Sequence, residues 1–103
     1  MEKREILQNL KELTLDFFEG RRTREETVHE LYKRMSYPED FDEAADKDEF
    51  IQRVYWDLRH LTHEKPFETK IEEILYFMEC FEGKRTYSIE DWNNYLHEKM
   101  KGK

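Results

Sequence analysis

The sequence predicts an all-α protein, a small bundle of four or five helices that forms a single helical domain over residues 1–103. Apolar residues recur every three or four positions along most of the chain, as they do on the buried face of a helix. The three glycines and two prolines are too few for the turns of an all-β chain of 103 residues. Aromatic residues make up 15% of the chain, and they should supply most of the core because they bury the most area per residue.

The first two helices are expected to form an αα-hairpin. An apolar period of 3.6 residues over residues 3–19 predicts the first helix, and Gly20 supplies the left-handed residue that ends it. Thr23 then opens the second helix. Glu26, three residues later, completes a capping box in which each side chain bonds the other residue's free backbone N–H. The short connection places the two helices side by side.

Three further helices are predicted in the second half of the chain. Residues 47–63 form a central helix that joins the first hairpin to a second one, and Pro66 marks its end. The second hairpin consists of residues 67–82 and 89–100. Within it, residues 71–81 are the most apolar run of the chain and are apolar around most of the helix. We therefore expect this run to be a central rod with neighbours on several sides.

A hexapeptide recurs where the first and fourth helices end. Residues 18–23 read Phe-Glu-Gly-Arg-Arg-Thr, and residues 81–86 read Phe-Glu-Gly-Lys-Arg-Thr. One interpretation is a duplicated basic recognition loop. The other, which we favour, is that glycine ends each helix, positive charge offsets the helix dipole and a hydroxyl caps the next helix. The second cap is Thr86 or Ser88, and with Ser88 the capping-box position falls to Asp91.

The composition narrows the class of partner. The formal net charge of -7 and the pI near 5.2 favour a basic partner and argue against nucleic acid or an anionic membrane, whose phosphates would be repelled. The single Cys80 excludes an intramolecular disulfide and indicates a reducing compartment, and we expect it to be a buried, inert thiol. The sequence contains neither a signal-type apolar core nor a membrane-length apolar run. We therefore expect a cytoplasmic protein.

Candidates for catalysis and metal binding are few. His60, His63 and Glu64 lie on one side of a helix end, and imidazoles at this spacing can share a metal, but their order matches neither zinc-protease pattern. Residues 40–51 fail as a calcium loop because Ile51 stands where a bidentate Glu belongs. Neither a glycine-rich phosphate loop nor a nucleophile elbow is present. We expect no enzyme activity and no cofactor, and metal binding through His60 and His63 is a minor alternative.

The strongest functional signal is an acidic segment, residues 39–49, just before the third helix. It carries seven carboxylates and one base, Lys47, so its net charge is -6. Aromatic residues flank it, and Trp56 is expected near the rim as an exposed anchor. Interfaces favour such aromatic anchors, and charge of one sign speeds association with a partner of the opposite sign. The alternative is a solvated, mobile loop that only keeps the protein soluble. The predicted partner-binding residues are Tyr37, Glu39, Asp40, Asp42, Glu43, Asp46, Asp48, Glu49 and Trp56.

The start of the chain also resembles a known family. Residues 13–26 read Leu-Thr-Leu-Asp-Phe-Phe-Glu-Gly-Arg-Arg-Thr-Arg-Glu-Glu, an aromatic pair at a helix end, a Gly-Arg link, a Thr cap and acidic helix residues. This arrangement resembles the beginning of the colicin D-type immunity proteins, although Thr27 stands where that family commonly has an aromatic residue. The resemblance implies a small helical bundle that binds a nuclease toxin and blocks its basic active-site cleft with acidic side chains.

Two functions from different classes follow from these observations. The first is a monomeric or weakly dimeric inhibitor of the toxin-immunity kind, which covers a basic surface of a partner protein and binds neither nucleic acid nor membrane. The second is a structural subunit that forms a homodimer through exposed aromatic residues, with the acids only keeping it soluble.

Overall fold

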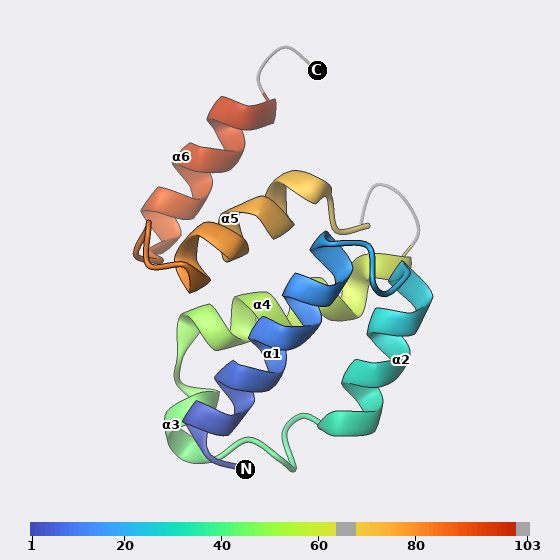
Figure 1. The fold of residues 1–103 in the computed structure, drawn as a ribbon. Coiled ribbons are helices and arrows are strands. Elements are labelled where there is room, and N and C mark those ends of the chain that lie inside the picture. The colour runs from blue at the N-terminus through green and yellow to red at the C-terminus, as the bar shows by residue number, and fades with distance from the viewer. Residues whose placement is uncertain (64–67, 101–103) are drawn as a thin grey trace.

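The computed structural model describes residues 1–63 and 68–100, and over these residues it contains helices and no strand (Figure 1). The all-α class predicted from the sequence is confirmed. The predicted Pro66 boundary lies outside the described residues. The predicted start of the fourth helix at Phe67 is wrong, because residues 68–70 are not helical and the helix begins at Ile71. The elements are α1 (Lys3–Phe18), α2 (Arg24–Arg34), α3 (Glu43–Asp46), α4 (Glu49–Arg59), the 3-10 helix η1 (His60–Thr62), α5 (Ile71–Phe81) and α6 (Ile89–Met100).

Each hairpin opens its second helix with a hydroxyl cap. The N–H of Glu26 donates to Thr23 Oγ1 at 3.1 Å and the N–H of Thr23 donates to Glu26 Oε1 at 2.9 Å, so the predicted capping box is present. In the second hairpin the cap is Ser88, whose Oγ accepts from the N–H of Asp91 at 3.0 Å. The Asp91 carboxylate accepts from the Tyr76 hydroxyl at 2.9 Å, which ties α6 to α5.

The recurring hexapeptide ends α1 and α5 in the same way. Gly20 has φ +80° and Gly83 has φ +77°, the left-handed region that glycine adopts without strain. In each loop the N–H of the residue after the glycine donates to the carbonyl five residues earlier, at 2.8 Å in the first loop and 2.9 Å in the second. This is the Schellman arrangement, which satisfies carbonyls left over at a helix end.

The arginines of the hexapeptide are bound by acids of the same chain. Asp16 accepts from Arg21 at 2.8 Å and from Arg22 at 3.2 Å, and these bonds hold the pKa of Asp16 below its usual value. In the second loop Arg85 donates to both carboxylate oxygens of Asp91, at 3.0 and 3.1 Å. Because these charges are used internally, the geometry supports the helix-end interpretation over the recognition-loop interpretation.

The bundle is organised around α1 and α4. Helix α1 packs against α2, α3, α4 and α5, and α4 packs against α1, α2, α3 and η1. Helix α4 is therefore the central helix between the two hairpins, as predicted. The apolar run in α5 also has several neighbours, α1, α6 and the Phe50 ring of α4, but it is not the centre of the bundle (Figure 1). Among the described residues, no helix combines the length and apolar character that crossing a bilayer demands.

Aromatic rings fill the contact between α5 and α6, as the composition predicted. The Phe77 and Trp92 rings are stacked, with centroids 5.2 Å apart and an interplanar angle of 8°. The Tyr76 ring meets Trp92 edge to face at 5.1 Å. Phe77 and Tyr76 are fully buried. This aromatic layer extends to α4 through Phe50 and brings α5, α6 and α4 together.

Candidate functional site

The acidic segment has a defined conformation that its own carboxylates stabilise. Asp42 Oδ1 accepts from the N–H of Ala45 at 2.8 Å and caps α3, a one-turn helix inside the segment. Asp48 Oδ1 accepts from the N–H of Ile51 at 2.9 Å and caps α4. Asp40 accepts from a backbone N–H just upstream at 2.7 Å. These bonds argue against the interpretation of the segment as a mobile loop.

Among the described residues, most of the segment's charge has no ion-pair partner. Asp48 pairs with Lys3 at 2.9 Å, and Glu43 pairs with Lys47 at 2.7 Å. In the parts of the chain that the structure describes, the other five acids form no ion pair. These five are Glu39, Asp40, Asp42, Asp46 and Glu49. A negative face therefore persists beside α4.

Two predicted aromatic residues lie next to this face and contact each other. The rings of Tyr37 and Trp56 meet edge to face with centroids 5.4 Å apart. The Tyr37 hydroxyl donates to Asp46 Oδ1 at 2.6 Å, and this bond raises the pKa of Tyr37 above its usual value. Trp56 is half-buried: its Nε1–H donates to Gln52 at 2.9 Å, and the Arg59 guanidinium lies 4.5 Å from its ring centroid. Trp56 is therefore at the rim, as predicted, but less exposed than a free anchor would be.

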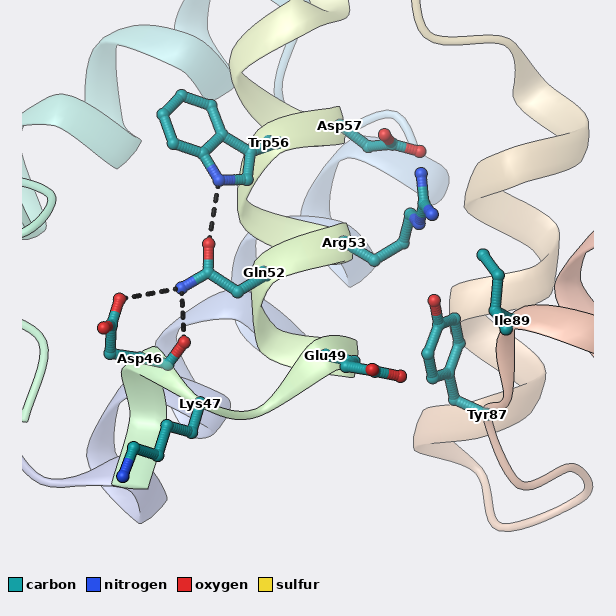
Figure 2. A pocket seen from close by; sticks show the side chains of 9 residues that line it. All are labelled: Asp46, Lys47, Glu49, Gln52, Arg53, Trp56, Asp57, Tyr87 and Ile89. Atoms are coloured by element: carbon teal, nitrogen blue, oxygen red, sulfur yellow. Dashed lines mark hydrogen bonds between the residues drawn. The ribbon is translucent and has the colours of Figure 1, made fainter. Parts of the chain in front are cut away.

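A groove over α4 brings predicted and unpredicted residues together (Figure 2). We call it the α4 groove, and its volume is about 560 Å³. The predicted residues Asp46, Glu49 and Trp56 line it, and Figure 2 shows Tyr87 and Ile89 facing α4 across the gap. The structure adds six residues that the sequence did not mark as site residues. These are Lys47, Gln52, Arg53, Asp57, Tyr87 and Ile89.

A buried carboxyl lies at one end of the α4 groove. Burial, and next the negative charge of Glu73 on α5, raise the pKa of Asp57 to about 8, against the opposing effect of Arg53. Burial also raises the pKa of Glu73. Asp57 therefore carries a proton at neutral pH. Figure 2 shows Arg53 and Asp57 pointing toward each other, and the Arg53 guanidinium lies 5.0 Å from the Trp92 ring centroid.

Two polar atoms of this cluster have no hydrogen-bond partner among the described residues. They are Arg53 Nε and Asp57 Oδ2, both shielded from solvent. Buried polar groups in native proteins are usually satisfied, and a carboxyl with a strongly shifted pKa beside a cavity marks a candidate functional site. The α4 groove is therefore the strongest candidate site of the described chain, and it adjoins the predicted acidic segment.

The minor candidates acquire no new support. The rings of His60 and His63 lie 5.0 Å apart, edge to face, and Glu64 lies outside the described residues. Within the described residues, no three His, Cys, Asp or Glu side chains gather closely enough to hold a metal ion. Burial raises the pKa of the half-buried Cys80 thiol to about 11, which agrees with the prediction of an inert thiol because the reactive thiolate scarcely forms at neutral pH.

Comparison with known proteins gives no match to a family model, a curated protein or a solved structure. The resemblance of residues 13–26 to colicin D-type immunity proteins therefore stays a prediction from the sequence. The acidic segment and the α4 groove are the features of the described chain that indicate a function.

Proposed function

We propose that this protein is a non-catalytic, acidic binding protein that covers a basic surface of a partner protein, in the manner of a toxin-immunity inhibitor. The observation that supports the proposal most is the fixed acidic segment. Its carboxylates cap α3 and α4, while five acids form no ion pair within the described residues. A chain that used these acids only for its own stability would pair more of them with its lysines and arginines.

The arrangement suits rapid recognition of a positively charged protein. Charges of one sign on a fixed surface steer a partner of opposite sign and raise the association rate. Because the segment is already ordered, little conformational freedom is lost on binding. Tyr37 and Trp56 lie beside the carboxylates and offer aromatic surface for the contact that follows encounter.

The homodimer alternative has less support. It requires an exposed aromatic anchor, and Trp56 is half-buried against Tyr37 and Arg59 of its own chain. Of the large apolar side chains that are exposed, one precedes α1 and the other four lie on four different helices. They are Met1, Phe18, Tyr32, Ile71 and Ile89.

The first test uses the product of the neighbouring gene as the partner. If that gene encodes a toxin, co-expression of this protein should protect the cell. The triple variant Glu39→Gln, Glu43→Gln and Glu49→Gln should then associate with the purified toxin about tenfold more slowly at low salt, and the difference should nearly vanish at high salt. Stopped-flow or surface plasmon resonance kinetics measure both rates. These three side chains are exposed and cap no helix, whereas Asp42 and Asp48 would disturb α3 and α4.

A matched control separates the effect of the acidic segment on the association rate from the effect of the total net charge. Glu12→Gln, Glu25→Gln and Glu98→Gln change the total charge equally, and all three residues are exposed on other helices. This control should keep an association rate within about twofold of the unmodified protein. A neighbouring toxin that kills despite co-expression would contradict the proposal. Equal rates for the segment variant and the unmodified protein at low salt would contradict it as well.

A further inference from the structure

Arg53 is a cation without an anionic partner in the wall of the α4 groove. Within the described residues its guanidinium forms neither an ion pair nor a hydrogen bond, and it lies 5.0 Å from the Trp92 ring centroid. Its Nε is shielded from solvent, whereas the rest of the half-buried side chain lines the groove. A guanidinium carries five donors and no acceptor, so an anion is the group that would satisfy its terminal nitrogens.

Two neighbours of Arg53 also favour an anion at this end of the groove. Figure 2 shows the Tyr87 hydroxyl directed toward the guanidinium from the other wall, and no described residue hydrogen-bonds this hydroxyl. Asp57 points toward Arg53 from the next turn of α4 and carries a proton at neutral pH, so it does not neutralise the guanidinium. A ligand therefore meets one positive charge and one hydroxyl donor here.

The other carboxylates near the groove leave this positive end in place. Among the described residues, neither Glu73 on α5 nor Glu49 on α4 forms an ion pair with Arg53. For Glu49 this is informative, because opposite charges four residues apart on a helix often pair. Glu49 is exposed, and Asp46 points to the opposite side of α4 (Figure 2). The groove therefore has its positive end at Arg53 and a negative rim at Glu49.

An apolar wall lies beside the guanidinium. Tyr87 is half-buried and presents its ring to the groove, and Ile89 is 48% exposed. An apolar group that covered Ile89 would remove part of its surface from water. The volume of about 560 Å³ falls in the range of pockets that enclose small ligands. A molecule with one carboxylate on an apolar body therefore matches both the guanidinium and the wall.

We infer that the α4 groove binds a small organic acid, whose carboxylate accepts hydrogen bonds from Arg53 and the Tyr87 hydroxyl and whose apolar body lies against Ile89. The acidic segment beside the groove favours a free small molecule over an acidic stretch of a protein, because several carboxylates would be repelled where a single one can enter. This site goes beyond the proposed function and does not rest on it.

The test titrates phenylacetate into the full chain labelled with ¹⁵N. We expect saturable shifts at the Arg53 Nε–H and at the backbone amides of Arg53 and Tyr87. Phenylacetamide, which is neutral, should bind at least about fivefold more weakly, because charge-assisted hydrogen bonds are roughly twice as strong as neutral ones. Phenethylamine, a cation of similar shape, should not bind. N-acetyl-glutamate amide presents a protein-type carboxylate without the aromatic body, and it should bind more weakly than phenylacetate.

Variants of single residues locate the site. Arg53→Gln should weaken phenylacetate binding at least about tenfold, whereas Arg4→Gln, an equal change of charge at an exposed position of α1, should leave it unchanged. Tyr87→Phe keeps the ring and should weaken binding about threefold, and it keeps the test informative if Arg53→Gln does not fold. Glu49→Gln should strengthen binding about twofold because it removes a negative charge from the rim, and Glu39→Gln, outside the groove, should not.

The absence of saturable shifts with phenylacetate at about 10 mM would overturn the inference. Equal binding of the acid and the amide, or tighter binding of phenethylamine, would do the same. Binding of N-acetyl-glutamate amide as tight as that of phenylacetate would favour a protein carboxylate as the occupant and would also overturn it. Weaker binding by Glu49→Gln would assign the opposite charge to the ligand. These results leave the kinetic test of the acidic segment intact, because that test measures association with a protein partner.

Discussion

Asp57→Asn is expected to stabilise the protein at alkaline pH by about 1–3 kcal/mol, since an amide keeps the shape of the carboxyl and never ionises. The folded-state pKa of Asp57 is raised to about 8 from 3.8. The folded protein therefore holds a proton that the unfolded chain has already lost at neutral pH. The contribution of Asp57 to the free energy of unfolding is therefore fully present below about pH 4, and it is lost as the pH rises toward 8. The advantage of Asp57→Asn should thus grow across that window.

Urea unfolding at a series of pH values between 4 and 9 measures this effect. The measured pH dependence of the unfolding free energy also contains the contributions of the charged groups near Asp57. These are Arg53 on the same helix, which lowers the pKa of Asp57, and Glu73 on α5, which raises it. Glu98→Gln serves as the control because Glu98 is exposed. The stability of this variant should change with pH in the same way as that of the unmodified protein. A stability of Asp57→Asn at pH 9 no higher than that of the unmodified protein would show that Asp57 ionises freely in the folded state.

Phe77→Ala is expected to cost about 3–5 kcal/mol of unfolding free energy, the usual loss for a large aromatic side chain in a core. Phe77 is fully buried, and its ring stacks on Trp92 and contacts Phe50, so the truncation leaves a cavity where α4, α5 and α6 meet. Small domains are stable by only about 5–15 kcal/mol, so this loss would be a large share of the total.

Chemical unfolding and thermal melting both measure the loss. Phe18→Ala removes the same atoms from a position that is 42% exposed and should cost less than about 1 kcal/mol. If Phe77→Ala is too unstable to purify, Phe77→Leu should fold and show a smaller loss in the same direction. A Phe77→Ala protein as stable as Phe18→Ala would contradict the packing of α5 against α4 and α6.

The helices could be predicted because their signals are local. The capping box of Thr23 and Glu26 and the glycines that end α1 and α5 each act within a few residues. Helix α3 was not predicted, because its four residues are too short to show an apolar period. Its one sequence signal is Asp42, whose side chain caps the turn three residues later. This cap could not be recognised from the sequence, because Asp42 lies among many other carboxylates.

The candidate site could be predicted only in part. The pattern of charges in the sequence predicted the acidic segment, and the aromatic residues beside that segment led to the prediction of Trp56. The contact of Asp57 with Glu73 joins residues 16 positions apart on two helices, so no spacing in the sequence indicates it. Along α4, Glu49, Arg53 and Asp57 alternate in charge every four residues, which is typical of a solvated helix face. This face became the wall of a groove because Tyr87, in the loop between α5 and α6, and Ile89 of α6 lie across from it.

The most direct measurement of the central claim is an amide hydrogen-exchange footprint of the protein bound to its basic partner, compared with the free protein. We predict slower exchange in residues 39–57, which span the acidic segment and α4, and also around Tyr87 and Ile89. Protection confined to α2 or the outer face of α6, with exchange in residues 39–57 unchanged, would contradict it.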